Sequence, residues 1–284
     1  MSLLAERFQS LLSDRYVIER ELGRGGMSVV FLARDTRHDR PVAIKVFRAD
    51  VGDASGAERF QREIKLLARL QHPHILPLYD SGTLGETSYF VSAFVEGETL
   101  RDRLKREHLL PVDEAVRLAL EVADALDFAH SQGVVHRDIK PENILLHDGH
   151  AVVGDFGIAR AIRRSAGEWT TAAGMTLGSP AYMSPEQAGG EREIDGRADI
   201  YSLGCVLYEM LAGIPPFSAR SAHMIIAAKL SSSARPVRVV RPEVPLALDT
   251  VLAKALERSP DDRFASARAF GASLAVSSPH SVPL

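Results

Sequence analysis

The chain has 284 residues, which fits one large domain or two lobes that share a cleft, and its 45% hydrophobic and 25% charged residues are ordinary for a globular protein. The net charge of −3 gives no reason to expect a nucleic-acid or anionic-membrane partner. The single cysteine, Cys205, excludes an internal disulfide, which fits a cytoplasmic protein and equally a secreted protein without disulfides. The longest apolar stretch, Ile200 to Ile214, is too short to cross a bilayer.

The first third of the chain predicts strands and one main helix. After an amphipathic helix over residues 3–12, the apolar pattern changes to a period of two, and a glycine-rich turn separates two β-rich runs. We expect strands from Tyr16 onward, at Val29–Leu32, at Pro41–Phe47 and at Ser88–Val95, and a helix at Ala57–Leu70.

The remainder predicts mainly helices. Pro111 takes the favourable first position of a long helix that Gly133 closes, and further helices are expected at about 197–212 and 246–257. The polar segment 165–184 has little periodicity, and the last dozen residues are typical of a frayed tail or a linker. The predicted secondary structure changes from mainly strands to mainly helices near residues 93–97. We therefore expect two unlike lobes with a small-molecule site between them.

Four motifs follow one another at characteristic distances. Leu22-Gly23-Arg24-Gly25-Gly26-Met27-Ser28 precedes a predicted strand, and Val42-Ala43-Ile44-Lys45 lies in the next strand. His136-Arg137-Asp138-Ile139-Lys140-Pro141-Glu142-Asn143 is the most specific motif, and Asp155-Phe156-Gly157 follows Asn143 by twelve residues. With this motif set the chain resembles the eukaryotic-type protein kinase family over residues 16–270, and bacterial Ser/Thr protein kinases in particular.

The resemblance implies an α+β, bilobal protein kinase fold. The N-lobe, residues 14–95, would be an antiparallel β-sheet with one main helix, and the C-lobe, residues 96–272, would be mainly helical. Residues 1–13 would form an N-terminal helical extension and residues 273–284 a flexible tail.

The resemblance also implies the residues of phosphoryl transfer. Asp138 would accept the proton of the substrate hydroxyl and orient it, and Lys140 would neutralise the γ-phosphate. Asn143 and Asp155 would bind Mg²⁺, which prefers a few hard oxygen ligands together with substrate phosphates. Lys140, two residues after Asp138, matches the Ser/Thr branch of the family rather than the tyrosine kinases.

Lys45 and Glu63 are expected to pair. Glu63 lies on the apolar side of its predicted helix, where a carboxylate needs a cationic partner. The resemblance makes Lys45 that partner, and it places the Lys45 ammonium at the α- and β-phosphates of ATP.

The nucleotide-binding residues follow from the same resemblance. A glycine turn alone is a weak signal, shared by simple hairpins and dinucleotide sites, but the strand at Val29–Leu32 excludes the dinucleotide reading, which needs a helix. Ser28 replaces the third glycine of the family, and Ser92 stands where the family usually has a larger gatekeeper residue. The backbone of Ala93 and Val95 would bind adenine. The full expected set is Leu22, Gly23, Gly25, Gly26, Ser28, Val30, Ala43, Lys45, Ser92, Ala93, Val95, Asn143 and Asp155.

The segment before residue 186 matches the end of a kinase activation segment. Ser179 would contact Asp138 and Lys140, Glu186 would pair with Arg263, and Asp199 would anchor the catalytic-loop backbone. Phosphorylation of Thr170, Thr171 or Thr176 would activate the enzyme, because a phosphate could pair with Arg137.

The sequence therefore predicts a Ser/Thr protein kinase that uses ATP and Mg²⁺, with Mn²⁺ as a substitute, and that has protein substrates. We expect no nucleic-acid partner, no membrane segment in this chain, a homodimer for trans-autophosphorylation, and a cytoplasmic location, alone or as part of a longer membrane-anchored protein. Two alternatives remain: a pseudokinase or ATP-binding signalling scaffold, and a kinase-fold enzyme that acts on small molecules. The complete catalytic set argues against the first, and the Lys140-Pro141-Glu142 run and residues 179–186 argue against the second.

Overall fold

The computed structural model describes residues 14–25, 28–47, 64–84, 87–156 and 180–277. These residues form two compact units: the first holds residues up to 71 and 76–96, and the second holds residues 72–75 and those from 97 onward. The helix expected at residues 3–12 lies outside the described residues.

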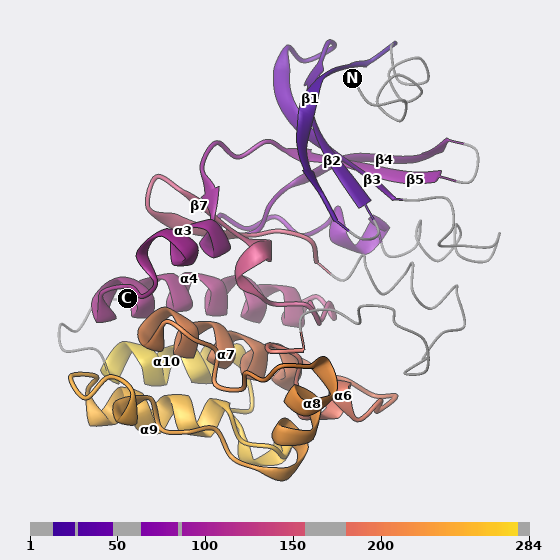
Figure 1. The fold of residues 1–284 in the computed structure, drawn as a ribbon. Helices are drawn as coiled ribbons and strands as arrows, with labels where there is room; N and C mark the ends of the chain where they lie inside the picture. Colours follow the sequence, from indigo (N-terminus) through magenta and orange to yellow (C-terminus); the bar gives the residue numbers. More distant parts are fainter. Residues whose placement is uncertain (1–13, 26–27, 48–63, 85–86, 157–179, 278–284) are drawn as a thin grey trace. The chain divides into compact units, whose positions relative to one another are not determined.

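The first unit is a five-stranded antiparallel sheet with the strand order β1-β2-β3-β5-β4 (Figure 1). This agrees with the expected strands, and β4, which contains Asp80 and Gly82, is an addition. The strands are β1 (Tyr16–Arg24), β2 (Ser28–Asp35), β3 (Arg40–Phe47), β4 (Leu78–Leu84) and β5 (Thr87–Ala93).

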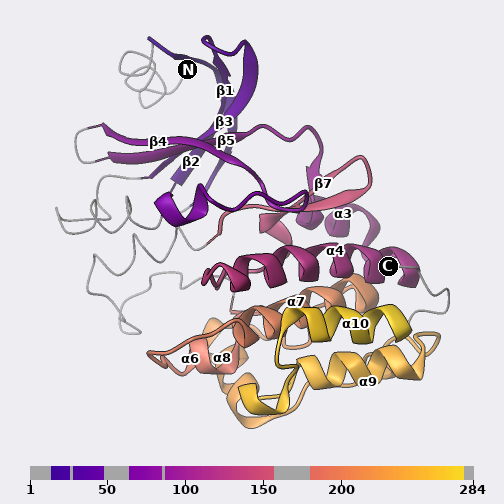
Figure 2. The ribbon, with the colours of Figure 1, turned by 180° about the vertical axis from the view of Figure 1, so that it is seen from behind.

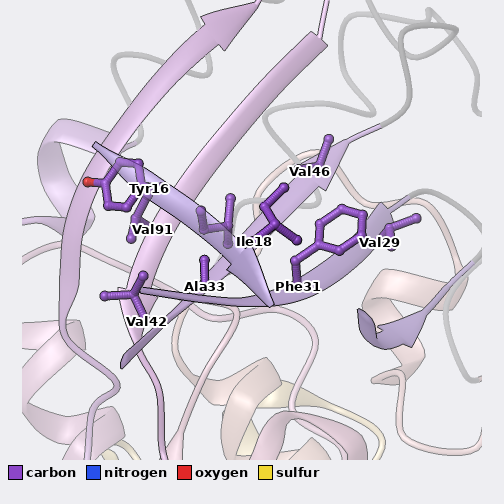
Figure 3. Close-up of a cluster of buried hydrophobic side chains, with 9 residues drawn as sticks. Tyr16, Ile18, Val29, Phe31, Ala33, Val42, Val46 and Val91 are labelled. Carbon is purple, nitrogen blue, oxygen red and sulfur yellow. The ribbon is translucent and has the colours of Figure 1, made fainter. Parts of the chain in front are cut away.

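Alternation along the strands gives this sheet one buried face. Side chains of a strand point alternately to its two faces, so every second residue of β2 and β3 faces the core. Figure 3 shows the resulting cluster, in which Phe31 and its neighbours have almost no exposed surface. The cluster consists of Tyr16, Ile18, Val29, Phe31, Ala33, Val42, Ile44, Val46 and Val91.

The helix expected at 57–70 is described only from residue 64. Residues 64–67 are helical, and Ile64 and Leu67 are buried as the apolar stripe predicts. Glu63 lies just outside the described residues.

Helices dominate the second unit. The helix α7 is buried along nearly its whole length, from Ala198 to Leu211, which explains why its sequence is apolar on all sides. Both ribbon views show α4 and α7 side by side and α10 beside α9 (Figures 1 and 2). The helices are α3 (Leu100–Glu107), α4 (Val112–Ser131), α6 (Pro185–Ala188), α7 (Arg197–Ala212), α8 (Ala222–Ser231), α9 (Leu246–Ala255) and α10 (Ala267–Ser277).

Short elements complete this unit. A three-stranded antiparallel sheet has the order β6-β7-β8 and carries the loops that precede and follow β7 and β8. The strands are β6 (Glu98–Thr99), β7 (Ile144–His147) and β8 (His150–Val153), and the 3₁₀ turns are η2 (Pro141–Asn143), η3 (Val237–Val239) and η4 (Pro260–Asp262). Within the described part of the chain, no helix combines the length and the apolar character that a membrane span requires.

The flexible tail expected from residue 273 is wrong for its first five residues. The helix α10 continues to Ser277, and Leu274 has no exposed surface. Phe270 and Leu274 lie four residues apart, so they form one apolar side of a helix that packs on α4. Residues 278–284 lie outside the described part of the chain.

Candidate active site

One buried carboxylate holds the loop between α4 and β7. Asp199 has no exposed surface, and it accepts the backbone N–H of His136 at 2.8 Å and that of Arg137 at 2.6 Å. Its Oδ2 also lies 2.8 Å from Nε2 of His130, on α4. Hydrogen bonds to an ionised acceptor are stronger than neutral ones. Asp199 therefore anchors the loop backbone, as the sequence analysis predicted.

The anchor requires a glycine just before α7. A Cβ at Gly196 would lie 2.5 Å from Nδ1 of His130, so any other residue would displace the imidazole from Asp199. Neither His130 nor Gly196 was identified from the sequence, because their contact joins two helices and belongs to no local motif.

Two side chains of this loop converge on the carboxylate of a third, Asp138. Lys140 Nζ lies 2.6 Å from Asp138 Oδ2, and Asn143 Nδ2 donates to Asp138 Oδ2 at 3.2 Å and to its backbone oxygen at 2.8 Å. The Asp138 side chain is 29% exposed and that of Lys140 is 18% exposed. The carboxylate is thus held by a cation and an amide, yet it remains accessible to an incoming group.

His136 joins this loop to the segment after β8. Its ring has no exposed surface, contacts the Gly154 oxygen through Nε2 at 2.9 Å, and lies 4.5 Å from the Phe156 ring centre. Gly154 also donates its backbone N–H to the Asn143 oxygen at 2.9 Å. His136 therefore packs and hydrogen-bonds, and it does not present a free imidazole for proton transfer.

The two residues expected to bind Mg²⁺, Asn143 and Asp155, flank the neighbouring strands β7 and β8. Ile144 and Val153 pair across β7 and β8, so Asn143, before one strand, and Asp155, after the other, lie at the same end of the small sheet. Asp155 has a φ of +60°, in the left-handed region, which is uncommon for residues other than glycine. Because Nδ2 of Asn143 is bonded to Asp138, its side-chain oxygen is the atom left for a metal. A carboxylate and an amide oxygen fit the ligand preference of Mg²⁺.

The expected nucleotide residues of the first unit share one face of its sheet. Val30 pairs with Lys45 across β2 and β3, and Ala43 pairs with Ser92 across β3 and β5. Val30, Ala43 and Lys45 are half-buried, whereas their strand neighbours Phe31 and Ile44 belong to the core on the opposite face. Ala43 and Lys45 therefore share one face of β3, as the alternation of a strand requires.

The turn and the end of β5 complete the described part of this set. Leu22 and Gly23 lie at the exposed end of β1, and Gly25 donates its backbone N–H to the Ser28 oxygen at 2.8 Å, which closes the turn. Ser92 is only 4% exposed, and its hydroxyl donates to the backbone oxygen of Ala93 at 3.3 Å. Val95 follows β5 and is half-buried.

Several expected residues lie outside the described part of the chain. These are Gly26 of the glycine turn, Glu63 as the partner of Lys45, Gly157, Ser179, and the threonines Thr170, Thr171 and Thr176. The pairing of Lys45 with Glu63 therefore stays a prediction.

The expected pair of Glu186 and Arg263 is confirmed. Nη1 and Nη2 of Arg263 each lie 2.7 Å from an oxygen of Glu186, and both side chains are almost fully buried. Two parallel bonds of this kind fix the geometry as well as the charge. One residue further, Gln187 Nε2 donates to the Arg137 oxygen at 2.9 Å. The start of α6 is thereby tied to the catalytic loop.

A second network, buried at Tyr182 and Glu209 and exposed at Glu142, reaches the loop from α3. Arg101 lies 2.8 Å from carboxylate oxygens of both Glu142 and Glu209, and it also contacts the Tyr182 hydroxyl. Burial, and then the neighbouring Glu209 carboxylate, raises the pKa of Tyr182, so this hydroxyl stays protonated and donates to Glu209. The sequence analysis missed this network, although Glu209 inside an apolar helix was a usable signal.

Comparisons with known proteins agree with this geometry. A family model described as "Protein kinase domain" matches residues 16–273. The "Serine/threonine-protein kinase PknB" of Mycobacterium leprae is 43% identical over 93% of this chain, and that of Mycobacterium tuberculosis strain H37Rv is 42% identical over 93%. The "Serine/threonine-protein kinase PknH" of Mycobacterium bovis is 40% identical over 89%. The chain spans 42–43% of the length of these relatives.

Proposed function

Because this chain belongs to the protein kinase domain family, we propose that it is a serine/threonine protein kinase that transfers the γ-phosphate of ATP to Ser and Thr hydroxyls of proteins. The observation that carries the proposal is the cluster of Asp138, Lys140 and Asn143 on a loop anchored by buried Asp199. The names of the matched relatives support Ser/Thr as the acceptor class.

Asp138 acts on the acceptor hydroxyl. Its partly exposed carboxylate can accept a hydrogen bond from the hydroxyl, orient the oxygen toward the γ-phosphorus, and take the proton as the new O–P bond forms. The leaving group is ADP, and the bond that breaks joins its β-phosphate oxygen to the γ-phosphorus. Positioned proton transfer of this kind contributes roughly 10²–10⁴-fold to the rate.

Lys140, Asn143 and Asp155 act on the phosphates. Lys140, 2.6 Å from Asp138, places a cation where negative charge spreads over the transferred phosphoryl group. Asn143 and Asp155 would hold Mg²⁺ through their side-chain oxygens. When bound, this ion neutralises phosphate charge, and Mn²⁺ can substitute for it.

The first unit supplies the nucleotide contacts of the proposal. The half-buried sheet face that carries Val30 and Ala43 would contact the adenine ring, and the backbone of Ala93 and Val95 would hydrogen-bond to it. Lys45, on the same face, would bind the α- and β-phosphates, with Glu63 as its carboxylate partner. The glycine turn closed by the bond from Gly25 to Ser28 would cover the phosphates.

The regulation and the setting of the enzyme are part of the same proposal. Phosphorylation of Thr170, Thr171 or Thr176 by a second copy of the chain would activate it, because a phosphate adds about −1.5 to −2 charge, which could pair with Arg137. We also take residues 14–95 and 96–272 as the two lobes, with the second lobe extended to Ser277 by α10, and the cytoplasm as the location, where ATP and reduced thiols are found.

An acceptor panel tests the proposal against its alternatives. The chain is incubated with Mg²⁺ and ATP labelled on the γ-phosphate, in separate reactions with myelin basic protein, casein, choline and an aminoglycoside. We expect label on Ser and Thr of the proteins, loss of labelling with a chelator, and recovery with Mg²⁺ or Mn²⁺. Label on a small molecule would favour the small-molecule kinase, and no transfer with retained ATP binding would favour the scaffold.

A further inference from the structure

Lys229, on α8, is a lysine without exposed surface. Its Nζ donates to the backbone oxygens of Ala181 at 2.7 Å and of Met183 at 2.8 Å. The same atom lies 4.8 Å from the Tyr201 ring centre and 5.4 Å from that of Phe217. Two carbonyl dipoles and two aromatic faces thus surround the ammonium group.

This arrangement is costly for a residue that only fills space. Burial penalises the charged amine and lowers the pKa of Lys229, and an aliphatic side chain of similar volume would avoid that penalty. Nζ also lies 3.9 Å from Sγ of Cys205, and burial raises the pKa of this thiol. What the lysine adds over an aliphatic residue is therefore its two hydrogen bonds to the backbone of residues 181–183.

The segment 181–183 is held from its other side as well. Between the two carbonyls bonded to Lys229 lies Tyr182, whose hydroxyl bonds to Arg101 and Glu209. Lys229 of α8 thus fixes the backbone of this segment on either side of Tyr182. Arg101 of α3 and Glu209 of α7 fix the Tyr182 side chain. Because three successive residues, Ala181, Tyr182 and Met183, are held by hydrogen bonds, the backbone conformation of this segment is fixed.

Two hydrogen bonds connect this part of the chain to the loop that carries the Asp138 carboxylate. Arg101 continues from Tyr182 to Glu142, at 2.8 Å, inside the loop that holds Asp138. On the other side, Gln187 bonds to the oxygen of Arg137, the residue before Asp138. The half-buried side chains of Ala181 and Met183 therefore lie on a surface whose position relative to Asp138 is determined within one unit.

We propose that Lys229 is a positioning residue for the protein acceptor: by holding the carbonyls of Ala181 and Met183, it fixes the surface against which the chain carrying the Ser or Thr lies beside Asp138. The inference rests on the proposed protein kinase activity. It assigns Lys229 to the binding of the protein acceptor and not to the binding of ATP.

The test compares Lys229→Met with Lys254→Met in steady-state phosphorylation of myelin basic protein. Met is an unbranched side chain of volume similar to that of Lys but cannot donate, and Lys254 is an exposed lysine whose Nζ lies 4.7 Å from the Phe264 ring centre. For Lys229→Met we expect the KM for myelin basic protein to rise about 10- to 100-fold while the KM for ATP stays within about twofold, because two hydrogen bonds from a charged group that hold this surface are lost, whereas no proposed nucleotide contact is. Lys254→Met should leave both constants unchanged.

Hydrogen exchange separates positioning from general damage. In Lys229→Met the amides of residues 181–188 should lose protection, while those of α4 and α7 keep it. Unchanged protection with an unchanged KM for the protein overturns the proposal. So does an equal rise of both KM values.

A donor-retaining variant decides the case if Lys229→Met does not fold. The side chain of Lys229→Gln is shorter and uncharged, but its amide can still donate to one carbonyl. The KM of this variant for myelin basic protein should therefore rise less than that of Lys229→Met, and its KM for ATP should not change. A rise for both substrates together overturns the assignment of Lys229. A wild-type chain that phosphorylates no protein contradicts the proposed kinase activity itself, which is a separate outcome.

Discussion

At the scale of single residues, Asp35 at the end of β2 shows how a buried carboxylate is kept charged. It is 1% exposed, and it accepts the backbone N–H groups of Arg37 at 3.1 Å and His38 at 3.3 Å, with the His38 ring 2.9 Å away. Burial by itself raises the pKa of Asp35, but these hydrogen bonds outweigh it, so that the pKa lies below its ordinary value.

This lowered pKa predicts a loss of stability in acid. A carboxylate whose folded-state pKa is depressed stabilises the fold above the unfolded-state value, near 4, and this contribution disappears as the pH falls through the folded-state pKa. We expect Asp35→Asn to unfold more readily than wild type at pH 7, and the difference to shrink below about pH 4. Urea unfolding at a series of pH values measures it.

Asp39 provides the matched control for Asp35. It is 81% exposed and pairs with Arg34 at the surface, where an ion pair contributes little. Asp39→Asn should change stability much less than Asp35→Asn at pH 7. A deficit of Asp35→Asn that stays constant from neutral to strongly acidic pH would show that its charge is not what stabilises β2.

Ser92 makes a second prediction at this scale, about inhibitors. It is a small, buried residue at the position where kinases usually carry a larger side chain, and it pairs with Ala43 on the proposed nucleotide face. We expect an adenine-site compound with a bulky aromatic group directed toward Ser92 to inhibit wild type at least about tenfold more strongly than Ser92→Met, because the added side chain overlaps that group.

The comparison for Ser92 needs an unmodified adenine analogue without the aromatic group. It should inhibit both proteins equally, and the KM for ATP should be similar in both. Equal inhibition of the two proteins by the bulky compound would show that no space lies behind the adenine at Ser92.

At the scale of whole elements, two helical glycines have opposite surroundings. A Cβ at Gly271 on α10 would lie 3.6 Å from the Cβ of Ala123 on α4, an ordinary contact. A Cβ at Gly204 on α7 would lie 3.2 Å from both Ala255 and Leu256, which is tighter than real side chains normally allow. Glycine in a helix interior costs about 1 kcal/mol relative to alanine. This cost is the same at both sites, so the effect of an alanine differs between them only through its packing.

These surroundings predict opposite signs for the same substitution. Gly271→Ala should stabilise the chain by about 0.5–1 kcal/mol, because the helix gains and nothing is displaced. Gly204→Ala should destabilise it, because overpacking in a core typically costs about 1–3 kcal/mol and exceeds the helical gain. Thermal unfolding of the two variants beside wild type provides the order, and a higher Tm for Gly204→Ala than for Gly271→Ala would contradict the packing of α7 against α9.

At the scale of the whole molecule, the long elements and the motif residues could be predicted from the sequence. The helix α7 matches its expected bounds of 197–212, because a continuous apolar stretch ends at Gly213, which has a left-handed φ of +76°. Asp138, Lys140 and Asn143 meet because they belong to one short loop, so that their spacing alone brings them together.

Elements with weak local signals could not be predicted. The strand β4 contains Gly82, on which the Tyr89 ring of β5 packs, so that its stability comes from the partner strand. In α3 only Leu100 and Leu104 are buried, too few for a clear helical stripe. The contacts of Lys229 and of Arg101 join residues far apart in the chain, and no local pattern announces them.

The measurement that most directly tests the catalytic assignment is the kcat of Asp138→Asn. Asn keeps the size of Asp138 but cannot take the proton of the acceptor hydroxyl, so kcat for phosphorylation of myelin basic protein should fall about 10²–10⁴-fold. Thermal unfolding and ATP binding should stay close to wild type, because Asp199 still holds the loop backbone. A fall in kcat of less than about threefold, with ATP binding retained, would contradict the assignment of Asp138 and the phosphoryl transfer built on it.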